Sequence, residues 1–169
     1  NRPQSSRWYP GAGLYRNVRL VTTERVHVPV WGTQLTTPHV SAEYASVRLR
    51  TTIRNAGDAD VRISTDIIAP DGKIVARKDN SRKINHGQPF EQNFLINAPS
   101  LWSPETPYLY KAVSKIYVDG KQTDEYTTRF GIRSIEIIAD KGFFLNGKHR
   151  KFQGVCNHHD LGPLGAAVD

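Results

Sequence analysis

The segment from Cys156 to Asp160 holds the side chains with the greatest capacity for chemistry: a thiol, two imidazoles and a carboxylate within five residues. Such groups bind metals, but zinc sites usually draw their ligands from two separated pairs, and the sequence offers no second pair. In an extended strand Cys156, His158 and Asp160 share one face, while Asn157 and His159 share the other. The segment therefore does not predict a metal site.

Cys156 is the single cysteine of the chain, so an internal disulfide is excluded. A nucleophilic thiol would need a base and a group that orients this base. The local sequence argues for neither, and we expect a buried, inert thiol.

Carboxylates form the second group with catalytic potential, because paired carboxylates perform acid–base and nucleophilic work. Asp58, Asp71, Asp119 and Asp140 all lie in stretches that predict turns. Aspartate favours such positions because its side chain hydrogen-bonds the nearby backbone. We therefore expect solvated turn formers rather than catalysts.

Exposed aromatic side chains could stack on sugars, and Trp8, Tyr9 and Trp31 are the candidates near strand ends. Aromatics at such positions more often pack against a neighbouring domain, because their large area contributes strongly when it is buried. We interpret them as interface residues. Without that neighbour they should form exposed apolar patches.

The chain of 169 residues carries a net charge of +7, yet its basic residues are scattered through alternating segments, as in Arg48, Arg50 and Arg54. This pattern is typical of a solvated face, so we expect no nucleic-acid partner. No apolar stretch approaches the length of a membrane span, and no membrane partner is expected. The chain begins with Asn1 and contains no methionine, which predicts a processed or excised piece.

The dominant signal along the chain is an alternation with period two. Apolar residues alternate with polar ones from Val47 to Arg54, and the pattern recurs in four further segments. Successive strand side chains point to opposite faces, so each segment predicts a strand with one buried face. The further segments are Val61–Ile67, Phe94–Ile96, Tyr108–Val118 and Tyr126–Ile132.

Turn signals separate these segments, and the strongest is Asp119-Gly120, because both residues tolerate the positive φ of a type I′ hairpin. Asn146-Gly147 is a second hairpin signal. Trp102 lies in a connector bracketed by prolines, and we expect it to pack at the edge of the sandwich that these strands form. About seven strands in about 100 residues predict an all-β, immunoglobulin-like β-sandwich over residues 24–133.

The two ends do not fit this sandwich. Residues 1–23 read as a glycine-containing turn that leads into the closing strand of an earlier domain. Residues 134–169 read as an apolar strand, a polar cluster and a glycine-rich loop, which is the pattern of one strand–loop unit of an α/β barrel. A whole barrel needs roughly 250 residues, so this barrel is truncated.

Three motifs carry a resemblance to family 2 glycoside hydrolases. Arg7–Val18 (RWYPGAGLYRNV) resembles the end of the family's sugar-binding-like sandwich, and Phe130–Arg133 (FGIR) resembles the close of its immunoglobulin-like domain. Gly142–Lys148 (GFFLNGK) and Gly154–Asp160 (GVCNHHD), with Leu164-Gly165, resemble the entry into its catalytic TIM barrel. The order matches the family's order, and the His-His-Asp variant is most similar to bacterial β-galactosidases.

The resemblance implies a retaining enzyme that uses two glutamates on later barrel strands, one of them directly after an asparagine. The chain contains no Asn-Glu dipeptide, so we expect an inactive fragment with no catalytic residue. It also implies that His158 contacts the sugar hydroxyls in the parent enzyme, and that acceptors for sugar hydroxyls are plausible at Asp160. Asn157 and His159 are interpreted as structural.

The partners implied by the resemblance are the parent's own N-terminal sandwich, its catalytic barrel and a carbohydrate substrate. No cofactor is expected in the fragment, whereas the parent can use a divalent or monovalent metal ion. The residues do not fix a compartment. For a bacterial parent we favour the periplasm or secretion over the cytoplasm.

Several alternatives stay open. The parent can be a β-glucuronidase or a β-mannosidase rather than a β-galactosidase. The chain can also be a free-standing carbohydrate-binding or adhesion module, although such a module should have polar termini rather than pieces of other domains. A basic nucleic-acid binder would need clustered Lys and Arg with interleaved aromatics on one face.

Overall fold

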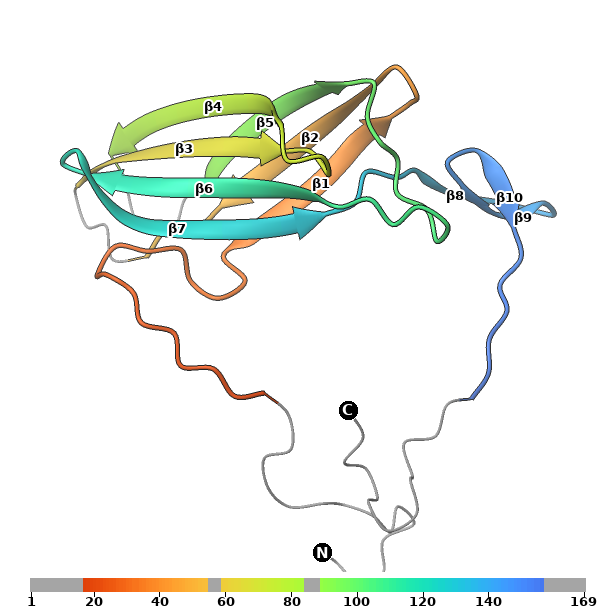
Figure 1. Cartoon of the computed structure of the whole chain (residues 1–169), viewed down its shortest axis with the longest axis horizontal. Helices are drawn as coiled ribbons and strands as arrows, with labels where there is room; N and C mark the ends of the chain where they lie inside the picture. The colour runs from red at the N-terminus through yellow and green to blue at the C-terminus, as the bar shows by residue number, and fades with distance from the viewer. Residues whose placement is uncertain (1–16, 55–58, 84–88, 157–169) are drawn as a thin grey trace, which may run out of the picture. The chain divides into compact units, whose positions relative to one another are not determined.

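A computed structural model describes residues 17–54, 59–83 and 89–156, which form strands, turns and extended segments without a helix. The predicted all-β class is thereby confirmed (Figure 1). The strands of the described ranges are β1 (Thr33–Val40), β2 (Tyr44–Thr51), β3 (Asp60–Ile68), β4 (Ile74–Lys83), β5 (Phe90–Asn97), β6 (Tyr110–Val118), β7 (Lys121–Phe130), β8 (Ile135–Ile138), β9 (Gly142–Leu145) and β10 (Lys148–Arg150).

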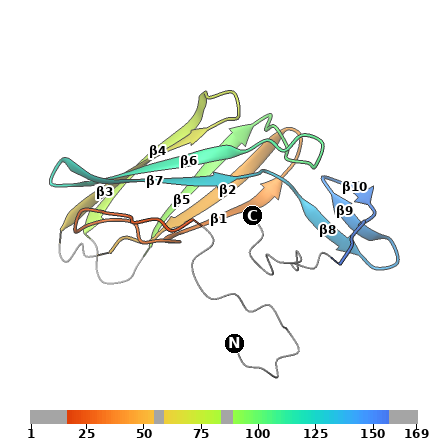
Figure 2. The ribbon, with the colours of Figure 1, turned by 60° about the horizontal axis from the view of Figure 1, so that its bottom comes forward.

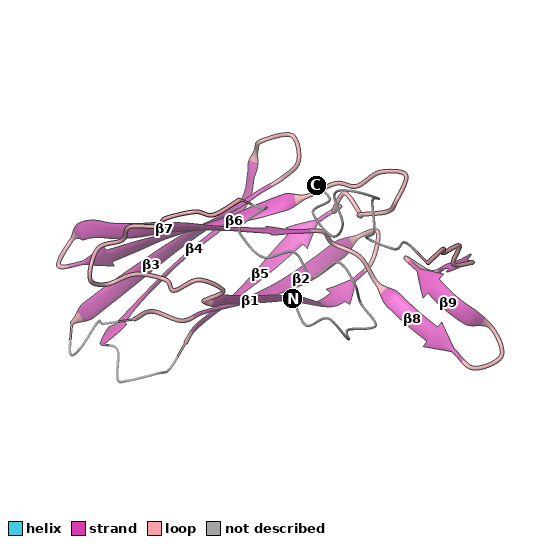
Figure 3. Ribbon diagram, turned by 90° about the horizontal axis from the view of Figure 1, so that it is seen from below, coloured by secondary structure: helices cyan, strands magenta, loops and turns pink. Residues whose placement is uncertain are grey.

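Seven of these strands form two antiparallel sheets that face each other. One sheet has the order β1-β2-β5 and the other has the order β4-β3-β6-β7. Figure 3 shows the two sheets as separate layers. Three strands on four with a shared interior is the architecture of an immunoglobulin-like sandwich, as the alternation predicted. A further small sheet, β10-β9-β8, follows β7 in the chain (Figure 2).

The interior of the sandwich is built by the inward faces of β2, β3, β5 and β6, each of which alternates between buried and less buried side chains. These side chains form two apolar clusters. The first comprises Ala45, Val47, Leu49, Ile67, Phe94, Ile96, Tyr110, Ala112, Phe130 and Ile132. The second comprises Val26, Val28, Ile53, Val61, Ile63, Phe90 and Ile116.

A belt of buried polar residues lies where the inward face of each of these strands passes from one cluster to the other. It consists of Thr51 on β2, Thr65 on β3, Gln92 on β5 and Ser114 on β6, all at most 1% exposed. Buried polar groups are costly unless they are hydrogen-bonded. The belt therefore stabilises the sandwich where its members have partners.

Gln92 provides most of these partners. The Thr65 hydroxyl donates to Gln92 Oε1 at 2.6 Å, and the Gln92 amide donates to the Lys78 carbonyl and to Asn80 Oδ1, both at 3.1 Å. Thr65 Oγ1 and Ser114 Oγ are 2.9 Å apart. Because the single Thr65 proton goes to Gln92, Ser114 must be the donor in this pair. The network joins β5 of one sheet to β3, β4 and β6 of the other.

β1 and β4 lack the sequence alternation that predicts the other five sandwich strands, and each lies at one edge of its sheet. β4 is largely exposed and rich in charged residues, which is how natural edge strands avoid pairing with other chains. β1 contains Pro38 at a register shift between Thr36 and His39. Proline cannot donate to the ladder and is confined to edges and bulges, so it obscures the strand pattern.

Both predicted hairpin turns are present. Asp119 and Gly120 have φ values of 50° and 78° between β6 and β7, and Asn146 and Gly147 have φ values of 51° and 73° between β9 and β10. Asp and Asn tolerate this left-handed region because their short polar side chains hydrogen-bond locally.

The chain divides into two units: residues 23–151 form one, and residues 1–22 and 152–169 form the other. The strands β1 to β10 of the described ranges all lie within residues 23–151. The described residues outside this unit, 17–22 and 152–156, contain no strand or helix and are exposed.

Candidate functional site

The predicted substrate-contacting residues, His158 and Asp160, lie outside the described residues, as do Asn157 and His159. Cys156, the last residue described, is exposed, so the prediction of a buried thiol is wrong. Residues 151–156 belong to no strand, and all of them are exposed.

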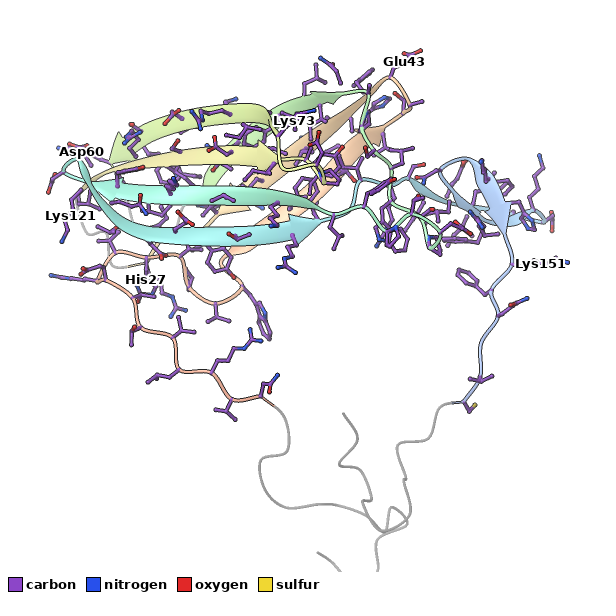
Figure 4. The ribbon with its side chains drawn as sticks, viewed as in Figure 1. His27, Glu43, Asp60, Lys73, Lys121 and Lys151 are labelled. Atoms are coloured by element: carbon purple, nitrogen blue, oxygen red, sulfur yellow. The ribbon has the colours of Figure 1, made fainter. Side chains whose placement is uncertain are left out.

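The aspartates that were expected in turns are found there. Asp71, Asp119 and Asp140 are exposed, while Asp58 lies outside the described residues. The Lys73 amide donates to Asp71 Oδ1 at 3.1 Å, and the Lys73 ammonium (labelled in Figure 4) lies 3.0 Å from Asp71 Oδ2. The hydrogen bond from the Lys73 backbone is the main cause that lowers the pKa of Asp71. These carboxylates lie in turns, as the sequence predicts.

A group of polar and aromatic contacts lies at the junction between the sandwich and the β8–β10 sheet. Trp102 is at its centre and is half-buried, as expected for the edge of the sandwich. Its amide donates to the Ile132 carbonyl at 2.8 Å, and the Arg133 guanidinium lies 4.6 Å from the ring centroid. A Cβ on Gly131 would lie 2.9 Å from Trp102 Cβ, so the close contact requires glycine there.

Asn146 connects this tryptophan to the small sheet. Its side-chain Nδ2 donates to the Trp102 carbonyl at 3.0 Å, and its Oδ1 accepts from the Ser134 amide at 3.0 Å. Its own backbone amide donates to the Ser134 carbonyl at 3.0 Å. One side chain in the β9–β10 turn therefore binds both the connector before β6 and the segment that leads into β8.

Arg150 and Glu105 make a second connection of the same kind. Arg150 Nη1 and Nη2 donate to the two carboxylate oxygens of Glu105 at 2.6 and 2.9 Å, a bidentate pair between β10 and the connector that contains Trp102. The hydrogen bond from Arg150 is the main cause that lowers the pKa of Glu105 to about 2. Planar, bidentate pairing adds geometric specificity to the attraction between the charges.

These contacts perform no bond chemistry; they hold the β8–β10 sheet in one orientation on the sandwich. We call the set Trp102, Arg133, Asn146, Glu105 and Arg150 the junction lock. The sequence predicts a packed Trp102 and a hairpin at Asn146-Gly147. The role of the Asn146 side chain and the Glu105–Arg150 pair cannot be read from it, because the partners lie 44 and 45 residues apart.

An open groove of about 540 Å³ lies beside the junction lock. Its walls come from β1, β7 and the residues around Arg133, with Leu35, Leu109 and Ile135 as apolar lining and Arg129 and Arg133 as charged lining. Among residues 17–54, 59–83 and 89–156, no cluster of three or more His, Cys, Asp or Glu is placed to hold a metal ion. No helix among them has the length and apolar character to cross a membrane.

A scan against protein families matches residues 28–133 to the model described as glycosyl hydrolases family 2. The chain is 43% identical to the β-galactosidase BoGH2A of Bacteroides ovatus, an alignment that covers 98% of this chain and 20% of that protein. It is 36% identical to a putative β-glucuronidase of Formosa agariphila, with 96% and 15% covered.

Solved structures show the same fold. A β-glycosidase from Bacteroides vulgatus superposes with a TM-score of 0.83 at 32% identity, covering 96% of this chain and 20% of that one. A β-glucuronidase from Bacteroides uniformis superposes with a TM-score of 0.76 at 27% identity, covering 87% and 19%. The chain thus spans about a fifth or less of the length of these relatives.

Proposed function

Because the chain belongs to family 2 of the glycosyl hydrolases, we propose that it is the non-catalytic linker of a retaining β-glycosidase that hydrolyses β-galactosides. In this proposal residues 24–133 are the linker sandwich. Residues 1–23 end the preceding sugar-binding-like sandwich, and residues 134–169 begin the catalytic TIM barrel. The partners of the linker are these two domains of the same parent.

The junction lock is the observation that carries the proposal. A linker that sets the position of a catalytic domain needs a rigid exit, and here the exit from the sandwich is held by hydrogen bonds, a cation–π contact and a bidentate ion pair. Catalytic groups lose activity when they are misplaced by about 1 Å, so rigid support is valuable even far from the chemistry.

The carboxylates of the described residues support a non-catalytic role. A retaining glycosidase needs one carboxylic acid with a raised pKa close to a second carboxylate. Where a carboxyl pKa departs from its ordinary value in residues 17–54, 59–83 and 89–156, it is lowered by a positively charged neighbour or a backbone amide, as in Asp66, Asp71 and Glu105. Such groups stay ionised and cannot donate a proton at neutral pH.

The choice of β-galactosides rests on the similarity to the Bacteroides ovatus β-galactosidase at 43% identity. The similarity to β-glucuronidases keeps a β-glucuronide as the alternative substrate. In either case we propose that His158 and Asp160 contact the sugar hydroxyls of the substrate in the parent enzyme, where their side chains can donate or accept hydrogen bonds. A metal ion, if the parent uses one, would be held by residues of the barrel.

The proposal is tested by assaying this chain and the full-length parent side by side on p-nitrophenyl β-galactoside and p-nitrophenyl β-glucuronide. We expect the parent to hydrolyse the galactoside and the chain to hydrolyse neither compound. Turnover by the purified chain would overturn the non-catalytic role, and a parent active on the glucuronide alone would overturn the substrate. In the parent, His158→Ala should lower kcat/KM by about 10- to 1,000-fold if the imidazole binds the sugar.

A further inference from the structure

Trp31 lies in a turn that precedes β1. The turn runs from Pro29 to Gly32, closed by a 2.7 Å hydrogen bond from the Gly32 amide to the Pro29 carbonyl. Trp31 has a φ of 58°, a left-handed conformation that bulky residues rarely adopt, and it is 91% exposed. The chain thus holds a large apolar side chain in solvent on a strained backbone.

The surroundings of the turn fix this conformation. A Cβ on Gly32 would lie 2.7 Å from both Cδ and the carbonyl oxygen of Pro29, so glycine is required at this position. The Gly32 carbonyl accepts a 2.7 Å hydrogen bond from the Thr52 amide, which attaches the turn to the end of β2. Strain that the surrounding structure maintains in this way occurs preferentially at functional sites.

The sheet face beside Trp31 is covered by planar polar side chains. The register of β1, β2 and β5 places Gln34, Arg50 and Glu91 in one row. Arg50 Nη1 donates to Gln34 Oε1 at 3.4 Å, and its Nε lies 3.9 Å from Glu91. The amide, guanidinium and carboxylate groups hold one another across the outer face of the sheet.

A second row repeats this arrangement one step along the strands. Thr36, Arg48 and Asn93 lie opposite one another there, and Arg48 Nε donates to Asn93 Oδ1 at 3.4 Å while lying 3.7 Å from Glu91. The rows offer amide and guanidinium donors together with amide and carboxylate acceptors. Vicinal hydroxyls of a sugar require this combination of donors and acceptors.

A pocket lies between Trp31 and the Gln34 and Arg50 side chains of the first row. It has a volume of about 190 Å³ and is lined by Trp31, Gln34, Arg50, Thr52 and Pro89. Trp31 contributes to the lining together with the hydrogen-bonding side chains of Gln34, Arg50 and Thr52 and the apolar ring of Pro89. An apolar plane with a few convergent polar groups is the usual composition of a small-molecule site.

An aromatic pair lies at the other end of the same face. His39 and Tyr44 stack with a centroid distance of 4.4 Å, next to the β1–β2 turn that contains Glu43 (labelled in Figure 4). The seven residues of β2 from Tyr44 to Arg50 span about 20 Å at strand rise. That span suits a short chain of linked sugars rather than a single ring.

We propose that the outer face of the β1–β2–β5 sheet, from Trp31 to Tyr44, is an accessory site for a neutral β-linked oligosaccharide. The indole packs against the C–H face of one pyranose, and the two polar rows bind hydroxyls of the following units. A neutral chain is favoured because the Glu91 carboxylate already lies 3.7 and 3.9 Å from the two arginine side chains and competes with a uronate for them.

The isolated chain tests this proposal without reference to the parent's activity. Cellotetraose and β-1,4-galactotetraose are titrated into the ¹⁵N-labelled chain while the indole N–H signals are followed. We expect saturable shifts of the Trp31 indole with a Kd on the order of 1 mM for at least one tetraose, while the Trp102 indole stays in place. Absence of saturable Trp31 shifts with both tetraoses would overturn the proposal.

Matched variants separate stacking from general effects. Trp31→Ala and Arg50→Ala should each weaken binding by about tenfold. Tyr108→Ala, which removes a half-exposed aromatic outside this face, should leave the Kd unchanged. Thermal unfolding of each variant verifies that it is folded. Equal weakening by Tyr108→Ala, or tighter salt-dependent binding of tetragalacturonate, would contradict a neutral-sugar site.

The full-length parent shows whether the site operates there. Trp31→Ala should raise KM for an oligosaccharide several-fold and leave kcat and the KM for p-nitrophenyl β-galactoside unchanged. An unchanged KM for the oligosaccharide would mean that Trp31 is covered by another domain, and the accessory site would be refuted for the parent. A parent without glycosidase activity would instead refute the proposed function and leave the result with the isolated chain intact.

Discussion

Thr51 and Thr65 are both fully buried, but only the Thr65 hydroxyl is hydrogen-bonded to a described residue. The Thr65 hydroxyl bonds Gln92 and Ser114, whereas the Thr51 hydroxyl has no hydrogen-bond partner among the described atoms. Removing a partnered group leaves other buried groups unsatisfied, while removing an unpartnered one removes a desolvation penalty. The same substitution should therefore have opposite effects at the two positions.

Replacement by valine keeps the shape of threonine and removes the hydroxyl. We expect Thr65→Val to lower the free energy of unfolding by about 1–3 kcal/mol, and Thr51→Val to leave it equal or to raise it by about 1 kcal/mol. Urea unfolding of both variants and the wild-type chain measures the difference. A loss at Thr51 equal to that at Thr65 would contradict the hydrogen-bond assignment.

Glu105 gives a second prediction at the residue scale. Its pKa is about 2 in the folded chain because Arg150 favours the ionised carboxylate. A lowered folded-state pKa contributes stability above the unfolded pKa near 4.5, and this contribution disappears as the pH falls toward 2. The pair is exposed, so the contribution is reduced by solvent and salt.

The carboxyl ¹³C shift of Glu105 should therefore titrate with a midpoint near 2 in the wild-type chain. In Arg150→Gln the midpoint should move toward 4.5, the ordinary value. Asp66, whose pKa is lowered chiefly by the hydrogen bond from Arg77, serves as a control and should titrate identically in both chains. A Glu105 midpoint that does not respond to the loss of Arg150 would show that the bidentate pair does not form in solution.

Among the elements, the β8–β10 sheet depends on the junction lock for its place on the sandwich. Asn146→Gly keeps the positive φ of the turn and removes the side chain that bonds Trp102 and Ser134. We expect the amide protection of residues 135–150 to fall by about tenfold or more, while β2, β3, β5 and β6 keep theirs. Hydrogen exchange followed by mass spectrometry or NMR measures both.

Asp119→Gly is the matched control, because it makes an equivalent change in the β6–β7 turn, where Asp119 has a φ of 50°. This variant should leave the protection of residues 135–150 at the wild-type level. An identical pattern for Asn146→Gly and Asp119→Gly would show that the side chain of Asn146 does not hold the sheet. The rigid exit proposed for the linker would then need another explanation.

At the scale of the whole molecule, every buried residue of the described ranges lies between Val26 and Leu145. Hydrophobic burial is the main favourable contribution to folding, so the stability of the chain should reside in residues 23–151. A chain truncated to these residues should unfold within about 1 kcal/mol, or about 4 °C, of the full one. Thermal and urea unfolding measure this difference. A larger loss would assign a stabilising role to the terminal segments.

Much of the fold follows from the sequence because strand alternation and hairpin turns are local. The buried faces of β2, β3 and β5 and the turns at Asp119 and Asn146 are readable from neighbouring residues. The edge strands β1 and β4 are not. Their less exposed positions hold mostly small or polar residues, so they carry little periodic signal, whereas β5, which also lies at a sheet edge, alternates cleanly.

The sequence by itself thus determined the all-β class, five of the seven sandwich strands, two hairpins and the resemblance to family 2 glycoside hydrolases. Only the tertiary structure decided which polar side chains meet. Thr65 and Gln92 are 27 residues apart, Thr65 and Ser114 are 49 apart, and Asn146 and Trp102 are 44 apart. The physical reason is that a period of two reports which face a side chain takes, whereas a hydrogen bond depends on which strands the fold brings together.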